Sequence, residues 1–177
     1  GFFVSTDLFT MFMFYEVALI PMYLLIGVWG SGRKEYAAMK LTLMLMGGSA
    51  FLLIGILGIF YGAGGETMNL LEIAKLHIPH EMQRIFFPLI FLGFGVLGAL
   101  FPFHTWSPDG HASAPTAVSM LHAGVLMKLG GYGCFRVAMY LMPEGAAMWG
   151  DVFLILTTIS VVYGAFSAVV QTDLKYI

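Results

Sequence analysis

Long stretches of this chain carry no charged side chain, and this feature constrains the fold most. Asp, Glu, Lys and Arg are absent from residues 41–65, 85–108, 110–127 and 152–172. About 20 apolar residues are enough for a helix to cross the hydrocarbon core of a bilayer. Strands of a membrane β-barrel would instead alternate polar and apolar residues over roughly ten positions. The sequence therefore predicts an all-α fold, a polytopic bundle of transmembrane helices.

The polar breaks between the apolar runs divide the chain into about five spans of membrane-crossing length within one transmembrane domain, 1–177. We expect the spans at 7–29, 40–61, 85–103, 116–141 and 150–171. Residues 68–76, in the longest loop, are expected to form a short amphipathic helix on the membrane surface. The distribution of Lys and Arg places the 30–39 loop and the C-terminal end in the cytoplasm. Because the chain opens at Gly1 inside an apolar stretch, we expect it to be an internal piece of a longer protein.

Composition excludes several other classes of protein. Hydrophobic residues make up 59% of the chain and charged residues 10%, against roughly 45–50% and about 25% in soluble domains. Disordered chains have the opposite balance. A net charge of -2 provides no basic field, so nucleic acid is not an expected partner. The single cysteine, Cys134, excludes a disulfide scaffold and a multi-cysteine metal cluster.

Glu16 is an acid near the middle of the first expected span. A charge at the bilayer centre costs at least about 2.5–3.5 kcal/mol, so such residues are functional candidates. Pro21 follows five residues later and is expected to kink the helix beside the acid. We interpret Glu16 as a proton carrier. The alternatives are a protonated carboxyl that hydrogen-bonds to a neighbour, or a position closer to the membrane interface.

Lys128 and His122 share the fourth expected span. Lys128 lies roughly in the middle of the span, where burial favours its neutral form and proton exchange; the alternative is a lysine that snorkels to the interface. Six residues separate the two side chains, which is about 9 Å of rise and about 240° of rotation. They therefore face different sides, and a water molecule would have to link them. His122 alone is also compatible with an ordinary core histidine.

Residues 102–116 interrupt the third span with three prolines and two histidines. Broken helices at membrane depth are tolerated where they line a polar cavity, and they mark ion sites in transporters. His104, Asp109 and His111 are therefore candidates here, with Lys40 of the second span as a further one. The alternative is an ordinary interfacial turn. No third ligand has zinc-like spacing, so we expect no metal site.

Several segments resemble the proton-pumping, antiporter-like subunit family of respiratory complex I, and its subunit M (chain 4) branch most closely. They are the motifs FPFHTWSPDGHASAPT from Phe101, HAGVLMKLGGYG from His122 and FYEVALIPMY from Phe14, together with Tyr163–Ala165 and Gln171–Lys175. The resemblance covers the whole chain as helices five to nine of about fourteen. The same pattern occurs in multisubunit cation/proton antiporters and membrane-bound hydrogenases.

The resemblance implies roles for individual residues. Glu16 corresponds to a glutamate that modulates a neighbouring lysine, and Lys128 to a lysine that passes protons toward the centre of the subunit. His122 corresponds to a histidine typical of the sister subunit L. The family's central lysine should lie seven residues before His104, where this chain has Leu97. We therefore expect His122 to substitute for it, with water or polar side chains linking His122 to Glu16 and Lys128.

The resemblance implies a proton-translocating membrane subunit of a bacterial NADH-quinone oxidoreductase, in the inner cell membrane. Redox chemistry would occur elsewhere, so no cofactor is expected on this chain; NADH, FMN, iron–sulfur clusters and quinone would bind partner subunits. Sister antiporter-like subunits and the lipid bilayer are the expected neighbours, and protons the transported ion. The alternatives are a subunit of a sodium/proton antiporter or a membrane-bound hydrogenase, or a structural member that does not pump.

Overall fold

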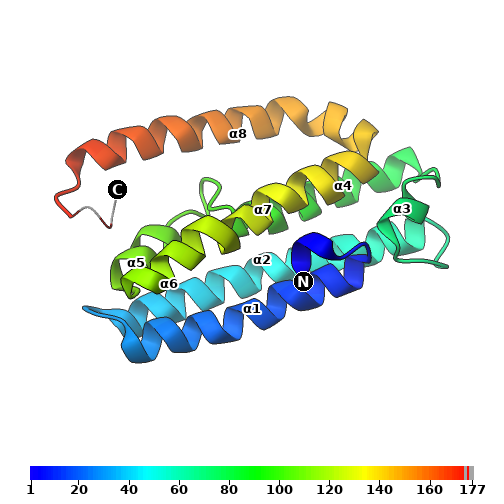
Figure 1. Cartoon of the computed structure of the whole chain (residues 1–177). Coiled ribbons are helices and arrows are strands. Elements are labelled where there is room, and N and C mark those ends of the chain that lie inside the picture. Colours follow the sequence, from blue (N-terminus) through cyan, green and yellow to red (C-terminus); the bar gives the residue numbers. More distant parts are fainter. Residues whose placement is uncertain (174, 176–177) are drawn as a thin grey trace.

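The computed structural model describes residues 1–173 and 175 as a bundle of long helices that run alternately in opposite directions (Figure 1). The predicted all-α bundle is confirmed. No strand occurs in the described residues, where one isolated bridge pairs Asp7 with Asn69. Leu174, in the motif Gln171–Lys175, lies outside the described residues.

Helix α1 spans Leu8–Trp29 and α2 spans Lys34–Gly62. The Asp7 side chain accepts a hydrogen bond from the Thr10 amide and so caps the start of α1. Pro21 lies inside α1, which continues past it. Gly32, in the turn between the two helices, has φ +63°, a left-handed conformation that favours glycine.

The loop after α2 contains α3, Leu70–Ile73, which lies within the expected amphipathic segment. The chain then returns as α4, His80–Leu97, and as the short helix α5, Trp106–Ser113. Residues 98–105 separate α4 from α5, so the expected broken helix is present.

The next stretch is helical from Thr116 to Leu141 but changes its winding twice. It consists of α6 (Thr116–Leu121), a π-helical segment η2 (His122–Leu126), α7 (Met127–Gly133), a second π-helical segment η3 (Cys134–Met139) and two last helical residues, 140 and 141. Such π-helical turns are frequent at functional sites. Helix α8 follows as Pro143–Val170, with Pro143 in its first turn, where the missing N–H costs nothing.

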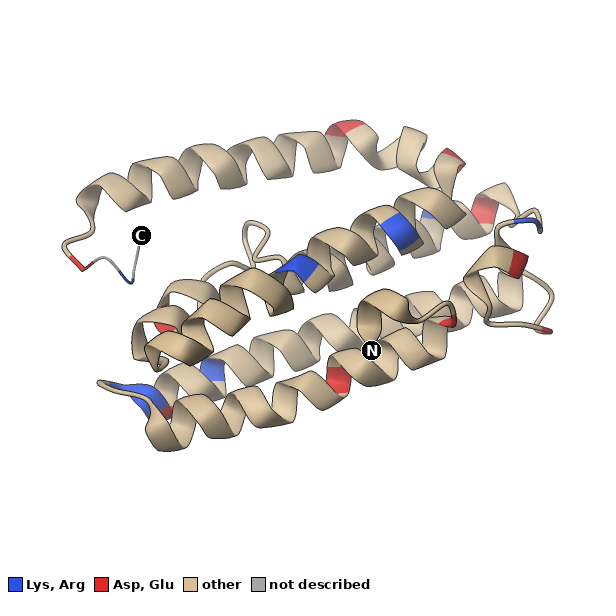
Figure 2. Ribbon diagram, viewed as in Figure 1, with Lys and Arg blue, Asp and Glu red and all other residues tan. Residues whose placement is uncertain are grey.

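Three of these helices, α1, α2 and α8, are long and apolar enough to cross a membrane. Helices α2 and α8 begin at residues 34 and 143, before the expected 40 and 150. The reason is that the spans were delimited by absence of charge, whereas a helix readily carries charges in its first turns. Charged residues gather toward the two ends of the bundle, with few along the helices (Figure 2).

Helices α2 and α4 pack closely because small residues meet at their crossing. A Cβ added at Gly93 of α4 would lie 2.9 Å from the Gly48 carbonyl oxygen of α2. Close approach through small residues is how membrane helices commonly associate.

Candidate functional site

The end of α4 is built by residues that stop the helix and cap it. Gly98 forms the C-cap, and Ala99 has φ +57°, a left-handed conformation that disfavours continuation of the helix. The indole N–H of Trp106, the first residue of α5, donates a hydrogen bond to the Val96 carbonyl oxygen at 3.1 Å. This bond satisfies one of the carbonyls that a helix end leaves free. The helix therefore ends in a defined, hydrogen-bonded conformation and does not fray.

Helix α5 forms despite the Pro108 and Gly110 in its sequence. Pro108 lies in its first turn, where a backbone N–H has no intrahelical partner anyway. Two of the candidate residues predicted from the sequence meet at this helix. Lys40 Nζ of α2 lies 2.7 Å from Asp109 Oδ2. Both side chains are about three-quarters buried, with 24% and 23% of their surface exposed. The pair fixes α5 against α2.

His111 of α5 and His122, the first residue of η2, lie side by side. Their ring centroids are 4.6 Å apart, and the His122 ring stacks on Trp106 at 5.3 Å with an interplanar angle of 13°. His111 Nδ1 lies 2.8 Å from the Ser119 hydroxyl, and its Nε2 lies 3.4 Å from Met127 Sδ. The π-helical segment η2 begins at His122.

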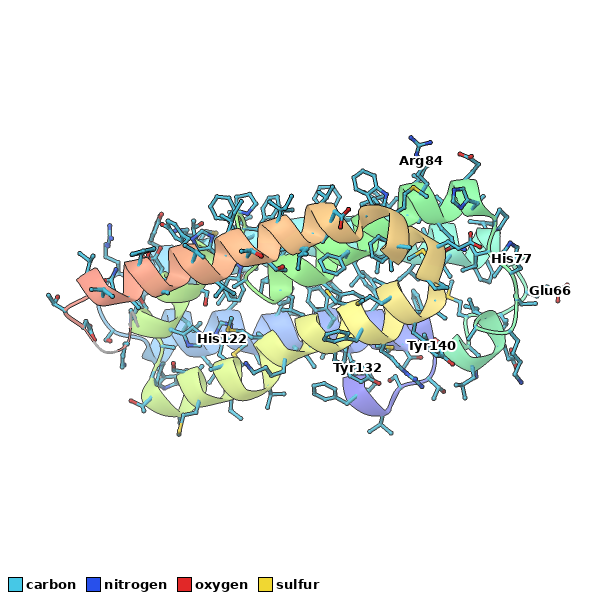
Figure 3. The ribbon with its side chains drawn as sticks, turned by 90° about the horizontal axis from the view of Figure 1, so that it is seen from above. Glu66, His77, Arg84, His122, Tyr132 and Tyr140 are labelled. Carbon is cyan, nitrogen blue, oxygen red and sulfur yellow. The ribbon has the colours of Figure 1, made fainter. Side chains whose placement is uncertain are left out.

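The His122 side chain is fully buried, and neither ring nitrogen has a hydrogen-bond partner among the described residues. Figure 3 shows His122 toward the end of the bundle that holds α5 and α6, with His77, Arg84 and Glu66 at the opposite end. Buried polar atoms without partners are rare and call for an ion, a water or a functional explanation. The two imidazoles of His111 and His122 are therefore in ring contact, but no hydrogen bond joins them.

His104 occupies the interruption itself, between two aromatic rings. Its ring stacks on Phe101 with centroids 5.6 Å apart, and it meets the Tyr163 ring of α8 edge-on at 4.9 Å. His104 Nδ1 is buried without a hydrogen-bond partner in the described part of the chain.

Glu16 lies halfway along α1 and is half-buried. Its Oε1 atom is buried and has no hydrogen-bond partner among residues 1–173 and 175. The preceding residue, Tyr15, is fully buried and donates a hydrogen bond to the Leu45 carbonyl oxygen of α2 at 2.8 Å. Tyr15 thus fixes the helix turn that carries the acid, a link that the sequence analysis missed.

Lys128 is exposed, whereas His122 on the same helical stretch is fully buried. Lys128 lines a cavity of about 610 Å³ between α4, α7 and α8, together with Gly98 and Ser160. Leu97, at the position of the expected lysine, is fully buried in the core. No lysine or other proton-binding group therefore occupies that place.

The expected group of Glu16, His122 and Lys128 is not joined by direct hydrogen bonds in the described residues. His122 instead lies against His111, with the two ring centroids 4.6 Å apart. A link through water stays a prediction. Among the described residues, no group of three His, Cys, Asp or Glu side chains is arranged to hold a metal ion.

The chain is similar to known proteins over nearly its full length. The family described as NADH:quinone oxidoreductase/Mrp antiporter, TM, matches residues 5–177. A NAD(P)H-quinone oxidoreductase chain 4 of Picosynechococcus sp. is 43% identical over 99% of this chain and 32% of its own length. The chloroplastic chain 4 of Citrus sinensis is 41% identical over 99% of this chain and 35% of its own length. The chain thus spans about a third of the length of these relatives.

Two solved structures share the fold. A chain of respiratory complex I from Thermus thermophilus has a TM-score of 0.92 and 31% identity, covering 99% of this chain and 38% of its own. A chain of the membrane-bound sulfane sulfur reductase, an archaeal respiratory membrane complex, has a TM-score of 0.90 and 29% identity, covering 99% and 36%. With a family match over residues 5–177 and the interrupted helix in place, this chain belongs to the NADH:quinone oxidoreductase/Mrp antiporter transmembrane family.

Proposed function

We propose that this chain is a proton-translocating part of the membrane arm of a bacterial NADH-quinone oxidoreductase. The observation that carries the proposal is the gathering of ionisable side chains around the interrupted helix of an otherwise apolar bundle. Lys40, His104, Asp109, His111 and His122 all lie within α2, α5, η2 or the interruption. Charged and titratable groups at membrane depth are costly and typically serve ion or proton movement.

The residues suggest how protons would pass. An imidazole takes up a proton at one ring nitrogen and releases one from the other. His111 and His122 would form a two-ring step joined through water, because neither ring nitrogen of His122 has a hydrogen-bond partner among the described residues. The Lys40–Asp109 pair holds α5 in place beside that step. Leu97 cannot bind a proton, so the route bypasses its position. Glu16 is the acid and Lys128 the base on the same route, and water would connect each of them to the two histidines.

The wider setting belongs to the same proposal. Relatives are named as chains of NAD(P)H-quinone oxidoreductases, so redox chemistry with NADH, FMN, iron–sulfur clusters and quinone would take place on partner subunits. Sister antiporter-like subunits would flank this one in a bacterial cell membrane. A sodium/proton antiporter is the second candidate, because the family description also includes the Mrp antiporter.

Reconstituted vesicles that contain the assembled complex with the full-length chain test the proposal. Proton uptake is measured during NADH oxidation, and sodium uptake is measured in parallel. We expect Lys128→Ala to lower the protons moved per NADH, more than His122→Ala does, and Lys75→Ala in the exposed loop to leave the ratio unchanged. Sodium uptake that persists without NADH would favour the antiporter. Normal proton uptake in both Lys128→Ala and His122→Ala would favour a structural role.

A further inference from the structure

Trp106, the first residue of α5, makes two contacts that join three helical elements. Its side chain is fully buried. The indole N–H donates a hydrogen bond to the Val96 carbonyl oxygen of α4 at 3.1 Å. The indole ring stacks on His122, at the start of η2, with ring centroids 5.3 Å apart and an interplanar angle of 13°. One rigid side chain therefore holds the His122 ring in a fixed position relative to the end of α4.

The elements packed around His122 offer its ring no counter-ion. Their charged and titratable side chains are Glu16 of α1, Lys40 of α2, Asp109 and His111 of α5 and Lys128 of α7, and those of α4 lie in its first two turns. Neither ring nitrogen of His122 has a hydrogen-bond or ion-pair partner in the described part of the chain. A proton on the neighbouring His111 ring would repel a second one on His122. A buried cation without an opposite charge is costly, so a protonated His122 needs another source of negative potential.

The face of the Trp106 indole provides that potential. The π-system of an aromatic ring is negative on its face, and it attracts a cation within about 6 Å of the ring centroid, most strongly when the ring is that of tryptophan. The His122 ring lies within this distance. The attraction is larger where water is excluded, and both side chains are fully buried. The stack therefore stabilises a protonated His122 more than an aliphatic neighbour in the same place would.

We propose that Trp106 is a positioning residue for proton transfer, because its indole face holds the protonated His122 ring in place of a carboxylate counter-ion. The inference rests on the proposed function and names the residue through which a buried histidine is put to use. Uptake of a proton at Nδ1 or Nε2 turns the neutral ring into an imidazolium, and release of a proton restores the neutral ring. Trp106 gains and loses no atom. An uncharged indole also leaves no unpaired carboxylate buried between two passages, as an acidic partner would.

Hydrogen–deuterium exchange at the Cε1 position of histidine tests the stack without relying on pumping. Mass spectrometry of peptides from the assembled complex, with the full-length chain, follows the protonation of each ring through this slow exchange. Trp106→Phe keeps a flat aromatic face, whereas Trp106→Leu keeps an apolar side chain without one. We expect the pH midpoint of exchange at His122 to lie about 0.5–1.5 pH units lower in Trp106→Leu than in the parent, with Trp106→Phe in between.

The chain offers matched controls for this experiment. His77 lies at the opposite end of the bundle and serves as the internal reference (Figure 3). Trp149→Leu is the control variant, because Trp149 also donates its indole N–H to a backbone carbonyl, that of Arg84 at 3.0 Å. We expect Trp149→Leu to leave the exchange midpoint of His122 unchanged. Equal midpoints at His122 in the parent and in Trp106→Leu would overturn the inference.

Fluorinated tryptophan, supplied during growth, gives a second test that holds even if Trp106→Leu fails to assemble. Fluorine withdraws electron density from the indole face and weakens its attraction for a cation, while the shape of the side chain hardly changes. We expect the exchange midpoint of His122 to fall stepwise as fluorine atoms are added to the ring, with His77 unchanged. A midpoint of His122 that ignores fluorination, or a ring that never exchanges in the parent, would overturn the inference.

Proton uptake per NADH, measured on the same preparations, separates the inference from the proposed function. We expect Trp106→Leu to pump less than Trp106→Phe. A shifted midpoint at His122 with normal pumping by Trp106→Leu would overturn the positioning role and leave the proposed function intact. Parent complexes that move no protons would overturn the proposed function, and the exchange midpoints would then still decide whether the indole face holds the protonated ring.

Discussion

Lys40 on α2 and Asp109 on α5 form an ion pair with Nζ and Oδ2 2.7 Å apart. The two residues are 69 positions apart in the chain. The pair joins the helix before the interruption to the short helix after it, and its side chains are mostly buried. It is therefore a structural support for the segment that carries His104 and His111.

Removing one partner of this pair is expected to destabilise the protein more than removing both. Lys40→Met leaves the Asp109 carboxylate mostly buried and unpaired, which should cost about 1–3 kcal/mol. The double variant Lys40→Met/Asp109→Asn leaves no unpaired charge and should cost less than Lys40→Met alone. Thermal unfolding of the assembled complex measures these differences. A double variant that is less stable than Lys40→Met would contradict this prediction.

Glu16→Gln is expected to reduce coupled proton pumping strongly while the complex still assembles. Glutamine has nearly the same shape as glutamate but cannot release a proton, so the substitution removes only the chemistry. Proton uptake per NADH in vesicles is the measurement. Glu66→Gln, in the exposed loop after α2, is the matched control and should pump normally. Normal pumping by Glu16→Gln would show that this carboxyl is not a proton carrier.

His122→Phe should separate packing from proton transfer. Phenylalanine keeps a flat ring against Trp106 but removes two buried nitrogens that lack partners in the described residues. We expect the free energy of unfolding to rise by about 1–2 kcal/mol and proton pumping to fall. Thermal unfolding and vesicle assays on the same preparation test both effects, with the exposed His77→Phe as control. A rise in stability with unchanged pumping would identify His122 as a core residue only.

Gly130→Ala is expected to disturb the crossing of α7 with α4. A Cβ at Gly130 would lie 2.5 Å from the Gly98 amide nitrogen and 2.6 Å from the Phe94 carbonyl oxygen. Backbone atoms cannot move aside cheaply, so we expect a cost of about 1–3 kcal/mol in stability.

The neighbouring Gly131→Ala is the control, because a Cβ there has no atom within 4 Å. Its effect should be neutral or stabilising by up to about 1 kcal/mol, since alanine favours the helix. Yield and unfolding temperature of the complex compare the two variants. Equal behaviour of both would contradict close packing of α7 on the interruption.

The sequence alone determined which segments form helices and roughly where one of them is interrupted. Continuous apolar runs require helices in a membrane because the backbone must satisfy its own hydrogen bonds there. The prolines and glycines after Leu97 indicate an interruption without any tertiary contact, because proline lacks the backbone N–H that continues a helix. The helix ends differ from the predicted ones: α2 begins at Lys34 and α8 at Pro143, because hydropathy reports the depth of the hydrocarbon and not the limits of helical hydrogen bonding.

The sequence also singled out the ionisable residues, because each is costly in an apolar run. Only the tertiary structure decided their partners. Helical spacing relates residues within one helix, but Lys40 and Asp109, or His104 and Tyr163, come from different elements. The π-helical winding that begins at His122 likewise has no signature in the spacing. Packing of distant segments against each other set these neighbours, and a linear pattern of residues does not contain that information.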